Sequence, residues 1–63
     1  MKQSFIEKYY MNKDVEIDVG GEDHYRGVVA ECNEGILSLK WDIAEEGYTH
    51  IDIDDIRAIW KQK

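Results

Sequence analysis

Apolar and polar residues alternate most regularly between residues 14 and 19. Val15, Ile17 and Val19 are separated by single acidic residues, and this period of two places them on one face of a β-strand. Gly20-Gly21 follows at once. Because glycine adopts positive φ angles without steric cost, this pair predicts a tight hairpin turn. We therefore predict a strand that begins near residue 14 and ends at the two glycines.

Two further strands are predicted between residues 25 and 40. The apolar residues between Tyr25 and Ala30 indicate a long second strand, which Gly27 interrupts. A glycine within a strand usually marks a bulge or a sharp bend, and we favour a barrel corner over a local irregularity. A polar turn at residues 33–35 precedes the apolar segment 36–39, which we expect to be buried on more than one side. Together these patterns predict a three-strand meander.

A short helix is predicted from about residue 4 to residue 11, ending near Asn12. Ser4 and Glu7 have the spacing of a capping box, in which each side chain bonds a free backbone N–H. The apolar side chains of this segment share a single helical stripe: Phe5, Ile6, Tyr9 and Tyr10. Two helical turns are not stable alone in water, so we interpret the stripe as a surface that packs against the rest of the chain, rather than as a surface on which a ligand stacks.

The remainder of the chain predicts a loop and two more strands. Residues 41–47 are mostly polar and are expected to form an exposed loop. Residues 48–53 alternate again, with Thr49, Ile51 and Ile53 on one side. A tight turn at Asp54-Asp55 then leads into a short last strand. The chain is therefore predicted to be mostly β, one domain over residues 1–63, with the helix preceding five strands at about residues 14–60.

Composition limits the ways in which so small a domain is stabilised. A chain of 63 residues buries little apolar surface. Its one cysteine, Cys32, excludes an internal disulfide and suggests a reducing compartment. No Cys/His cluster has the spacing of a structural zinc site, so self-association is the leading explanation for stability. There is neither an apolar signal-peptide core nor an apolar run that spans a bilayer, so we expect a cytoplasmic protein without a membrane partner.

The net charge of −6 is distributed unevenly. Residues 1–13 carry three lysines against Glu7, which gives +2, and residues 57–63 add +3. Residues 14–56 carry 13 acidic groups against two basic ones, which gives −11. An acidic body repels phosphate backbones, whose binding rests largely on lysine and arginine. Any contact with nucleic acid is therefore expected at the basic ends or at base edges.

The order of these elements resembles the Sm-like fold, in which a short helix precedes a strongly bent second strand and a tight turn joins the last two strands. The sequence is similar to Sm and Lsm proteins, to the bacterial RNA chaperone Hfq and to small uncharacterised prokaryotic Sm-like proteins. The most specific segment is G-V-V-A-E-C-N-E-G-I-L-S-L-K, where Gly27 matches the glycine that bends the second strand. Asn33 stands where Sm proteins and Hfq usually carry aspartate. The resemblance implies a five-stranded, bent antiparallel, SH3-like barrel.

The resemblance also implies a ring of roughly five to seven subunits, in which the fourth strand of one subunit pairs with the fifth strand of the next. Open strand edges need a partner or a cover, which agrees with the argument from size. The interface residues that this arrangement implies are Thr49, Ile51, Ile53, Arg57, Ile59 and Trp60.

The residues of the usual RNA pocket differ from the family pattern. Hfq-like pockets stack a base on an aromatic residue just after the aspartate position, where this chain has Gly35. A basic residue in the last turn completes those pockets, whereas here the turn at residues 53–55 carries two carboxylates. Tyr48-Thr49-His50 is similar to a Tyr-Lys-His segment of Hfq but lies several residues too early. The resemblance therefore extends to the fold and not to the pocket.

No other group of residues predicts catalysis or a cofactor. The carboxylates at residues 14–18 and 52–55 lack EF-hand spacing, and we interpret them as solvated, although a ring would repeat them around a shared site. Cys32 has no oxyanion motif or orienting third residue to accompany a histidine, so we expect a small buried hydrophobe and no enzyme. Trp60 is expected at a barrel or subunit contact, and Trp41 at the surface.

Two functional hypotheses remain open, with an enzyme as a remote third. One is an Sm-like ring that binds RNA weakly or unconventionally, and the other is an acidic Sm-like assembly that binds protein or acts as a scaffold. The family resemblance favours RNA, and the charge opposes it. The residues expected to contact RNA or a partner are Lys2, Lys8, Lys13, Asn33, Trp41, Lys61 and Lys63.

Overall fold

Alternate residues of the first strand divide between core and solvent, as their pattern predicts. In the computed structural model, which describes residues 1–40 and 47–62, Val15 and Ile17 are buried and their neighbours are partly exposed. The elements in chain order are α1 (Gln3–Tyr9), β1 (Asp14–Asp18), β2 (Tyr25–Asn33), β3 (Ile36–Lys40), β4 (Tyr48–Asp52), the 3-10 turn η1 (Ile53–Asp55) and β5 (Ala58–Lys61). The described chain is therefore mostly β with a short N-terminal helix.

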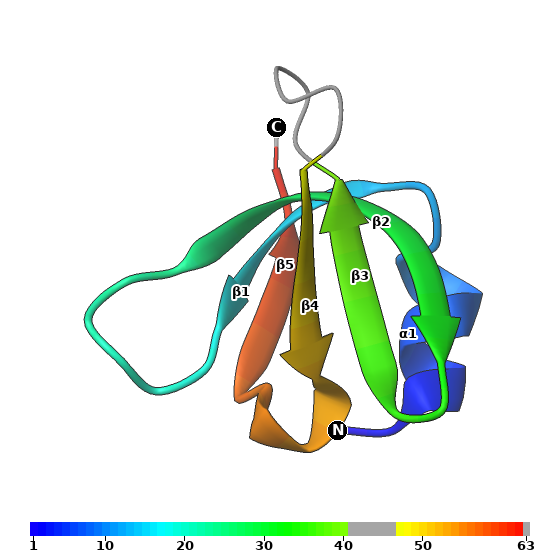
Figure 1. The fold of residues 1–63 in the computed structure, drawn as a ribbon, viewed down its shortest axis with the longest axis horizontal. Coiled ribbons are helices and arrows are strands. Elements are labelled where there is room, and N and C mark those ends of the chain that lie inside the picture. The colour runs from blue at the N-terminus through cyan, green and yellow to red at the C-terminus, as the bar shows by residue number, and fades with distance from the viewer. Residues whose placement is uncertain (41–46, 63) are drawn as a thin grey trace.

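The five strands form one antiparallel sheet in the order β4-β3-β2-β1-β5. Figure 1 shows the sheet strongly curved, with α1 beside the C-terminal part of β2 and with η1 joining the last two strands. The chain moves to a neighbouring strand at each step until β5, which crosses to the far side of β1. The two outer strands of the sheet are therefore β4 and β5.

The long strand β2 bends because its two halves have different partners. Residues 25–28 pair with β1, and residues 28–33 pair with β3. At Gly27 the backbone passes so close to β3 that a Cβ atom would lie 2.8 Å from the carbonyl oxygen of Lys40. Gly27 thus marks a close backbone approach, whereas the break in register lies further along, at Ala30.

The sequence predicts the turn between β2 and β3 correctly, but it does not predict the shape of the loop between β1 and β2. Glu34 and Gly35 both have positive φ angles, 51° and 79°, which is the geometry of a two-residue type I′ turn. The expected tight turn at Gly20-Gly21 is instead a wider loop over residues 19–24. The N–H of Gly20 donates to Oδ1 of Asp18 at 2.7 Å, and this local turn leads the chain away from β1 before it can pair.

The helix begins one residue earlier than predicted and lacks the predicted capping box, since no side chain caps its N-terminus and Ser4 lies inside the first turn. Gln3 provides the physical reason. Its Oε1 accepts from the N–H of Gly35 at 2.8 Å, and its Nε2 donates to Glu7 at 3.1 Å and to the carbonyl oxygen of Cys32 at 3.4 Å. These bonds fix the start of α1 against the β2–β3 turn, so tertiary contacts override the local signal.

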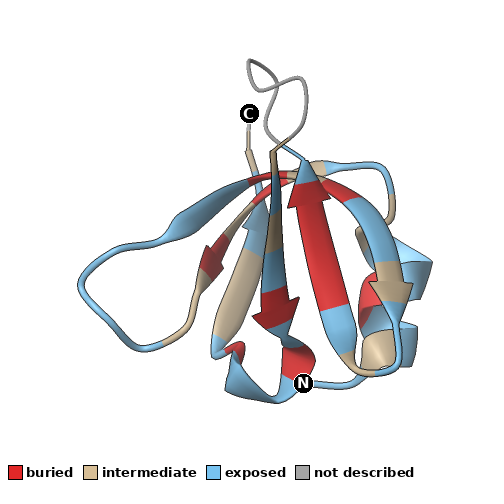
Figure 2. Cartoon of the chain, in the orientation of Figure 1, coloured by how far each residue is buried: buried red, intermediate tan, exposed pale blue. Residues whose placement is uncertain are grey.

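The core lies between the curved sheet and α1, as the buried segments in Figure 2 show. Residues 37–39 are buried on both faces of β3, which confirms the prediction for the third strand. Within the described residues, no helix is both long and apolar enough to cross a membrane. The buried apolar residues are Ile6, Val15, Ile17, Val29, Leu37, Leu39, Ile51, Ile53 and Ile56.

The aromatic stripe of α1 divides between core and solvent. Ile6 is fully buried and Tyr10 packs against the core, whereas Phe5 and Tyr9 are 45% and 50% exposed. With 3.6 residues per turn, positions 5 and 9 form one row and positions 6 and 10 form the next row. Only one row can face the sheet. The interpretation of the whole stripe as a packing surface is therefore wrong for Phe5 and Tyr9.

We expect Gly27→Val to lower the free energy of unfolding by about 1–3 kcal/mol, because its side chain must displace the backbone of β3. Chemical denaturation followed by circular dichroism measures this change. Gly21→Val is the matched control, since a Cβ at Gly21 meets no atom within 4 Å, and a change within about 0.5 kcal/mol is expected there. Equal effects at the two positions would contradict the close approach of β2 and β3.

Candidate assembly edges and an adjoining groove

The outer edge of β4 presents backbone groups that no other described strand pairs with. The N–H of Ile53 donates to the carbonyl oxygen of Gly35 at 2.9 Å, directly after the β3–β4 ladder. Hydrogen-bonded pairs alternate along an antiparallel ladder, so residues 49 and 51 direct their backbone groups to β3. The N–H and C=O groups of Tyr48, His50 and Asp52 therefore face away from the sheet.

The outer edge of β5 has the same property. The N–H of Gln62 donates to the carbonyl oxygen of Asp14 at 2.9 Å, and the register continues through residues 58 and 60. By the same alternation, the backbone groups of Ile59 and Lys61 face outward. The carbonyl oxygen of Ile59 accepts from the hydroxyl of Tyr10 at 3.4 Å and keeps a second lone pair.

A groove of about 200 Å³ runs beside the edge of β4. Successive side chains of a strand point to opposite faces, so a groove lined by four consecutive strand residues lies at the strand's edge. The loop after β1 and the start of β2 supply its apolar opposite wall. The lining residues are Val19, Tyr25, Thr49, His50, Ile51, Asp52 and Asp55.

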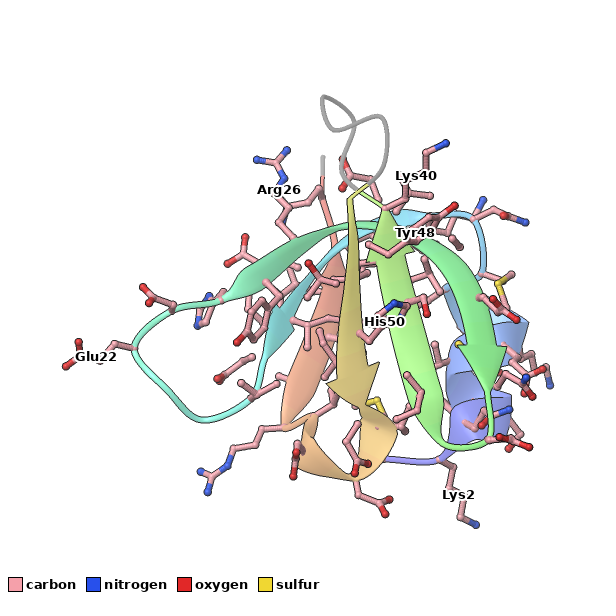
Figure 3. The ribbon with its side chains drawn as sticks, in the orientation of Figure 1. Lys2, Glu22, Arg26, Lys40, Tyr48 and His50 are labelled. Carbon is pink, nitrogen blue, oxygen red and sulfur yellow. The ribbon has the colours of Figure 1, made fainter. Side chains whose placement is uncertain are left out.

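The rings on the outer face of β4 hold a fixed arrangement. Oγ of the buried Ser38 lies 2.8 Å from Nδ1 of His50, its direct cross-strand neighbour. The rings of His50 and Tyr48 are nearly parallel, with 14° between their planes and 6.2 Å between their centroids. Figure 3 shows Tyr48 and His50 along β4, with Lys40 beside Tyr48. Both rings are exposed and oriented before any partner arrives.

Trp60 on β5 is also held in place while remaining 38% exposed. Its indole contacts the ring of His24 edge to face, with 5.4 Å between centroids. Nδ1 of His24 lies 2.6 Å from a carboxylate oxygen of Glu16, and the other oxygen of that carboxylate accepts from Nε2 of Gln62 at 2.9 Å. The ring of His24 thus supports the indole, and His24 is in turn held by Glu16, which Gln62 also contacts.

The two edges carry opposite charge. Asp52 ends β4, and Asp54 and Asp55 follow in η1, whereas Arg57 and Lys61 flank and end β5. All five side chains are exposed, and within residues 1–40 and 47–62 neither Arg57 nor Lys61 forms an ion pair. An acidic edge and a basic edge on one chain suit attraction between copies.

The predicted interface residues divide between these edges and the core of the single chain. Ile51 and Ile53 are 6% and 2% exposed, so their side chains already pack within their own chain and only Ile51 reaches the groove. Thr49 and Ile59 are half-buried at the two edges, and Arg57 and Trp60 are exposed. The edge residues and the groove-lining Ile51, rather than Ile53, offer a surface to a partner.

The residues predicted to contact RNA or a partner do not form one cluster on a single element. Lys2 and Lys8 are exposed at α1, Lys13 is exposed just before β1, Asn33 ends β2 and Lys61 ends β5. Trp41 and Lys63 lie outside the described residues.

Sequence reasoning missed an exposed aromatic pair on α1. Phe5 and Tyr9 lie 4.9 Å apart between ring centroids, and Nζ of Lys8 lies 5.4 Å from the centroid of Tyr9. The signal that identifies the pair is the presence of two adjoining rows in the stripe, of which only one can be buried.

The cysteine and the two histidines are the residues that the sequence offers as a candidate nucleophile and its bases. Partial burial, and then the carboxylates of Glu7 and Glu31, raise the pKa of the Cys32 thiol, which disfavours the nucleophilic thiolate. His24 and His50 are bonded to Glu16 and Ser38. Within the described part of the chain, no three His, Cys, Asp or Glu side chains are placed to hold a metal ion.

Comparison with known proteins gives one family. A family model described as a domain of unknown function, DUF6897, matches residues 2–62. The chain belongs to the DUF6897 family. No curated protein and no solved structure matches the chain. The DUF6897 match spans α1 and the five described strands, with both open edges.

We expect Cys32 to react slowly with iodoacetamide at neutral pH, because a raised pKa lowers the fraction of thiolate. The alkylation rate of the folded chain, relative to that of the unfolded control, should rise toward alkaline pH as the thiol deprotonates. The two rates should become equal at a pH at which the thiol is ionised in both states. Alkylation followed by mass spectrometry in buffer and in denaturant measures both rates. Equal rates in the folded and unfolded chains at neutral pH would contradict the burial of Cys32.

Proposed function

We propose that this chain is a non-catalytic, Sm-like module that assembles into a closed ring through its two outer strands. The observation that carries the proposal is the pair of open edges at opposite ends of one sheet, β4 and β5. An exposed strand edge is a template for pairing with another chain. Because the two edges are different surfaces, pairing between them is head-to-tail, and such contacts close into a ring when the rotation between copies allows.

The small core supports assembly as the way in which this domain gains stability. Only one of the two aromatic rows of α1 is buried, and the core contains a handful of isoleucine, leucine and valine residues. Domains of this size have a narrow margin over chain entropy. A strand added at each edge buries further surface and satisfies the outward backbone groups, without any metal or disulfide.

The Sm-like assignment rests on the order and shape of the elements. A short helix, a curved second strand that passes close to β3 at Gly27, and a one-turn connection between the last two strands all fit the resemblance seen in the sequence. A closed barrel and a ring of roughly five to seven subunits are what that resemblance implies. The raised pKa of Cys32 and the bonded histidines favour a role without catalysis.

We expect light scattering at micromolar concentration to give the mass of a closed oligomer of roughly five to seven subunits. Ile59→Lys should lower this mass and leave the circular dichroism spectrum intact, because Ile59 is only half-buried at the open edge. Ile53→Lys should abolish the folded spectrum, because it buries a charge in the core. A monomer of 7.4 kDa at all concentrations would defeat the proposal.

Contact with single-stranded RNA is a second candidate function, favoured by the exposed pair Phe5 and Tyr9, with Nζ of Lys8 near the ring of Tyr9 and with Lys2 exposed just before α1. Aromatic rings stack bases and lysines contact phosphates. A ring would repeat this surface around its axis, so weak contacts would add through multivalency. The acidic body opposes tight binding. The alternative is an acidic protein scaffold that does not bind nucleic acid.

We expect binding to short U-rich and A-rich oligonucleotides to be weak, poorly selective and steeply reduced between about 50 and 200 mM salt, since it depends on counterion release. Fluorescence anisotropy measures the affinity. Lys2→Glu should abolish binding, whereas the control Lys40→Glu should not. Figure 3 places these two lysines at opposite ends of the molecule. Equal losses would indicate a general charge effect, and no binding at any salt concentration would favour the scaffold.

A further inference from the structure

We propose that the groove beside β4 is the binding site for Trp60 of a second copy of this chain. In this arrangement, which rests on the proposed function, β5 of the second copy pairs antiparallel with β4. The register places Tyr48 opposite the partner's Lys61, His50 opposite the partner's Ile59, and Asp52 opposite the partner's Arg57.

Backbone geometry restricts the pairing to a few registers. The outward N–H and C=O groups belong to residues 48, 50 and 52 on β4 and to residues 59 and 61 on β5. An antiparallel ladder joins residues whose backbone groups face each other, so an even-numbered residue of β4 must lie opposite an odd-numbered residue of β5. Antiparallel pairing is also the arrangement of all the strand pairs within the sheet itself.

Charge and overlap then select one register. Centring His50 on the partner's Ile59 brings the carboxylate of Asp52 to the partner's Arg57, and the ring of Tyr48 to the partner's Lys61. A slip of two residues in one direction places Asp52 opposite Ile59, with the carboxylate beside an apolar side chain. A slip in the other direction shortens the ladder and moves Arg57 away from Asp52. The central register is therefore the one that places the opposite charges of Asp52 and the partner's Arg57 beside each other. Arg57 directly precedes β5, and its own N–H donates to the carbonyl oxygen of Asp18 at 2.8 Å, so this last pair joins side chains only.

The same register directs the indole into the groove. Thr49 lies opposite the partner's Trp60, and Ile51 opposite the partner's Ala58, and paired residues project from the same face of a sheet. Thr49 and Ile51 line the groove, with Val19 and Tyr25 as its apolar wall. Trp60 carries the largest side chain on β5 and is half-exposed. A buried tryptophan in such a pocket is a common anchor of an interface.

Both surfaces are prepared for the contact. His24 and Glu16 support the indole of Trp60, and Ser38 fixes the ring of His50. Side chains that are ordered before binding lose less entropy on association. Ile59 is half-buried and packs against the core of its own chain. His50 of the neighbouring copy covers its exposed side and so completes the burial of Ile59.

Disulfide trapping tests the register. In a Cys32→Ser chain, with Cys32→Ala as an alternative background, Tyr48→Cys and Lys61→Cys are placed on separate chains and mixed under mild oxidation. Directly opposite residues lie within reach of a disulfide, and diagonal ones do not. The matched control pairs Asp52→Cys with Lys61→Cys, also exposed positions. We expect at least about tenfold more cross-linked dimer from the first pair.

Trp60 fluorescence tests the groove itself. In Trp41→Phe, Trp60 is the remaining tryptophan, and its emission should shift to shorter wavelength as the chain assembles with rising concentration. Tyr25→Ala, which removes part of the groove wall, should reduce the shift and raise the concentration needed for assembly by about tenfold. Circular dichroism of each variant checks that the chain is folded.

The outcomes separate this inference from the proposed function. A wild-type chain that stays monomeric at every concentration overturns both. An assembled chain that cross-links through Asp52→Cys and Lys61→Cys, or through neither pair, overturns the register alone. Assembly without a shift in Trp60 emission overturns the groove as its site. Cross-linking by the first pair together with the shift supports the inference.

Discussion

The close approach of β2 and β3 at Gly27 is the constraint on which the other features depend. A Cβ atom at Gly27 would lie only 2.8 Å from the carbonyl oxygen of Lys40, so only a residue without a side chain lets β2 pass this close to β3. This contact, with the shift in register at Ala30, lets one strand pair with β1 along its first part and with β3 along its second. The sheet curves around its small core, and its ends, β4 and β5, are left as two unlike open edges.

Local pattern predicted the strands well because each has a single buried face or a short apolar run. The turn at residues 34–35 was also predictable, since its geometry demands positive φ. The predictions that failed concern features that depend on contacts between residues distant in sequence. Gln3 fixes the start of α1 through the β2–β3 turn, and curvature of the sheet leaves room for only one aromatic row, so Phe5 remains outside. No local signal specifies the contacts of Gln3, and the two rows of the stripe indicate that one of them is exposed without specifying which.

The candidate site was predictable only in part. The sequence placed Thr49, Ile59 and Trp60 near an interface through the family resemblance, and the structure places them at the sheet edges. The groove was not predictable, because Tyr25 and the residues of β4 that form it are far apart in the chain. Ile53 shows the opposite failure. Alternation identified an apolar position, but only the packed structure shows that its own core already buries it.

Amide hydrogen exchange, followed residue by residue by NMR, tests the central claim most directly, namely that the outward backbone groups of β4 and β5 pair between copies. The amides of His50 and Ile59 should become protected as concentration rises through the range of assembly, because each gains a hydrogen bond from the neighbouring strand. The amide of Ile51, which faces β3, should be protected throughout. Rapid exchange of His50 and Ile59 at every concentration, with Ile51 still protected, would contradict the account.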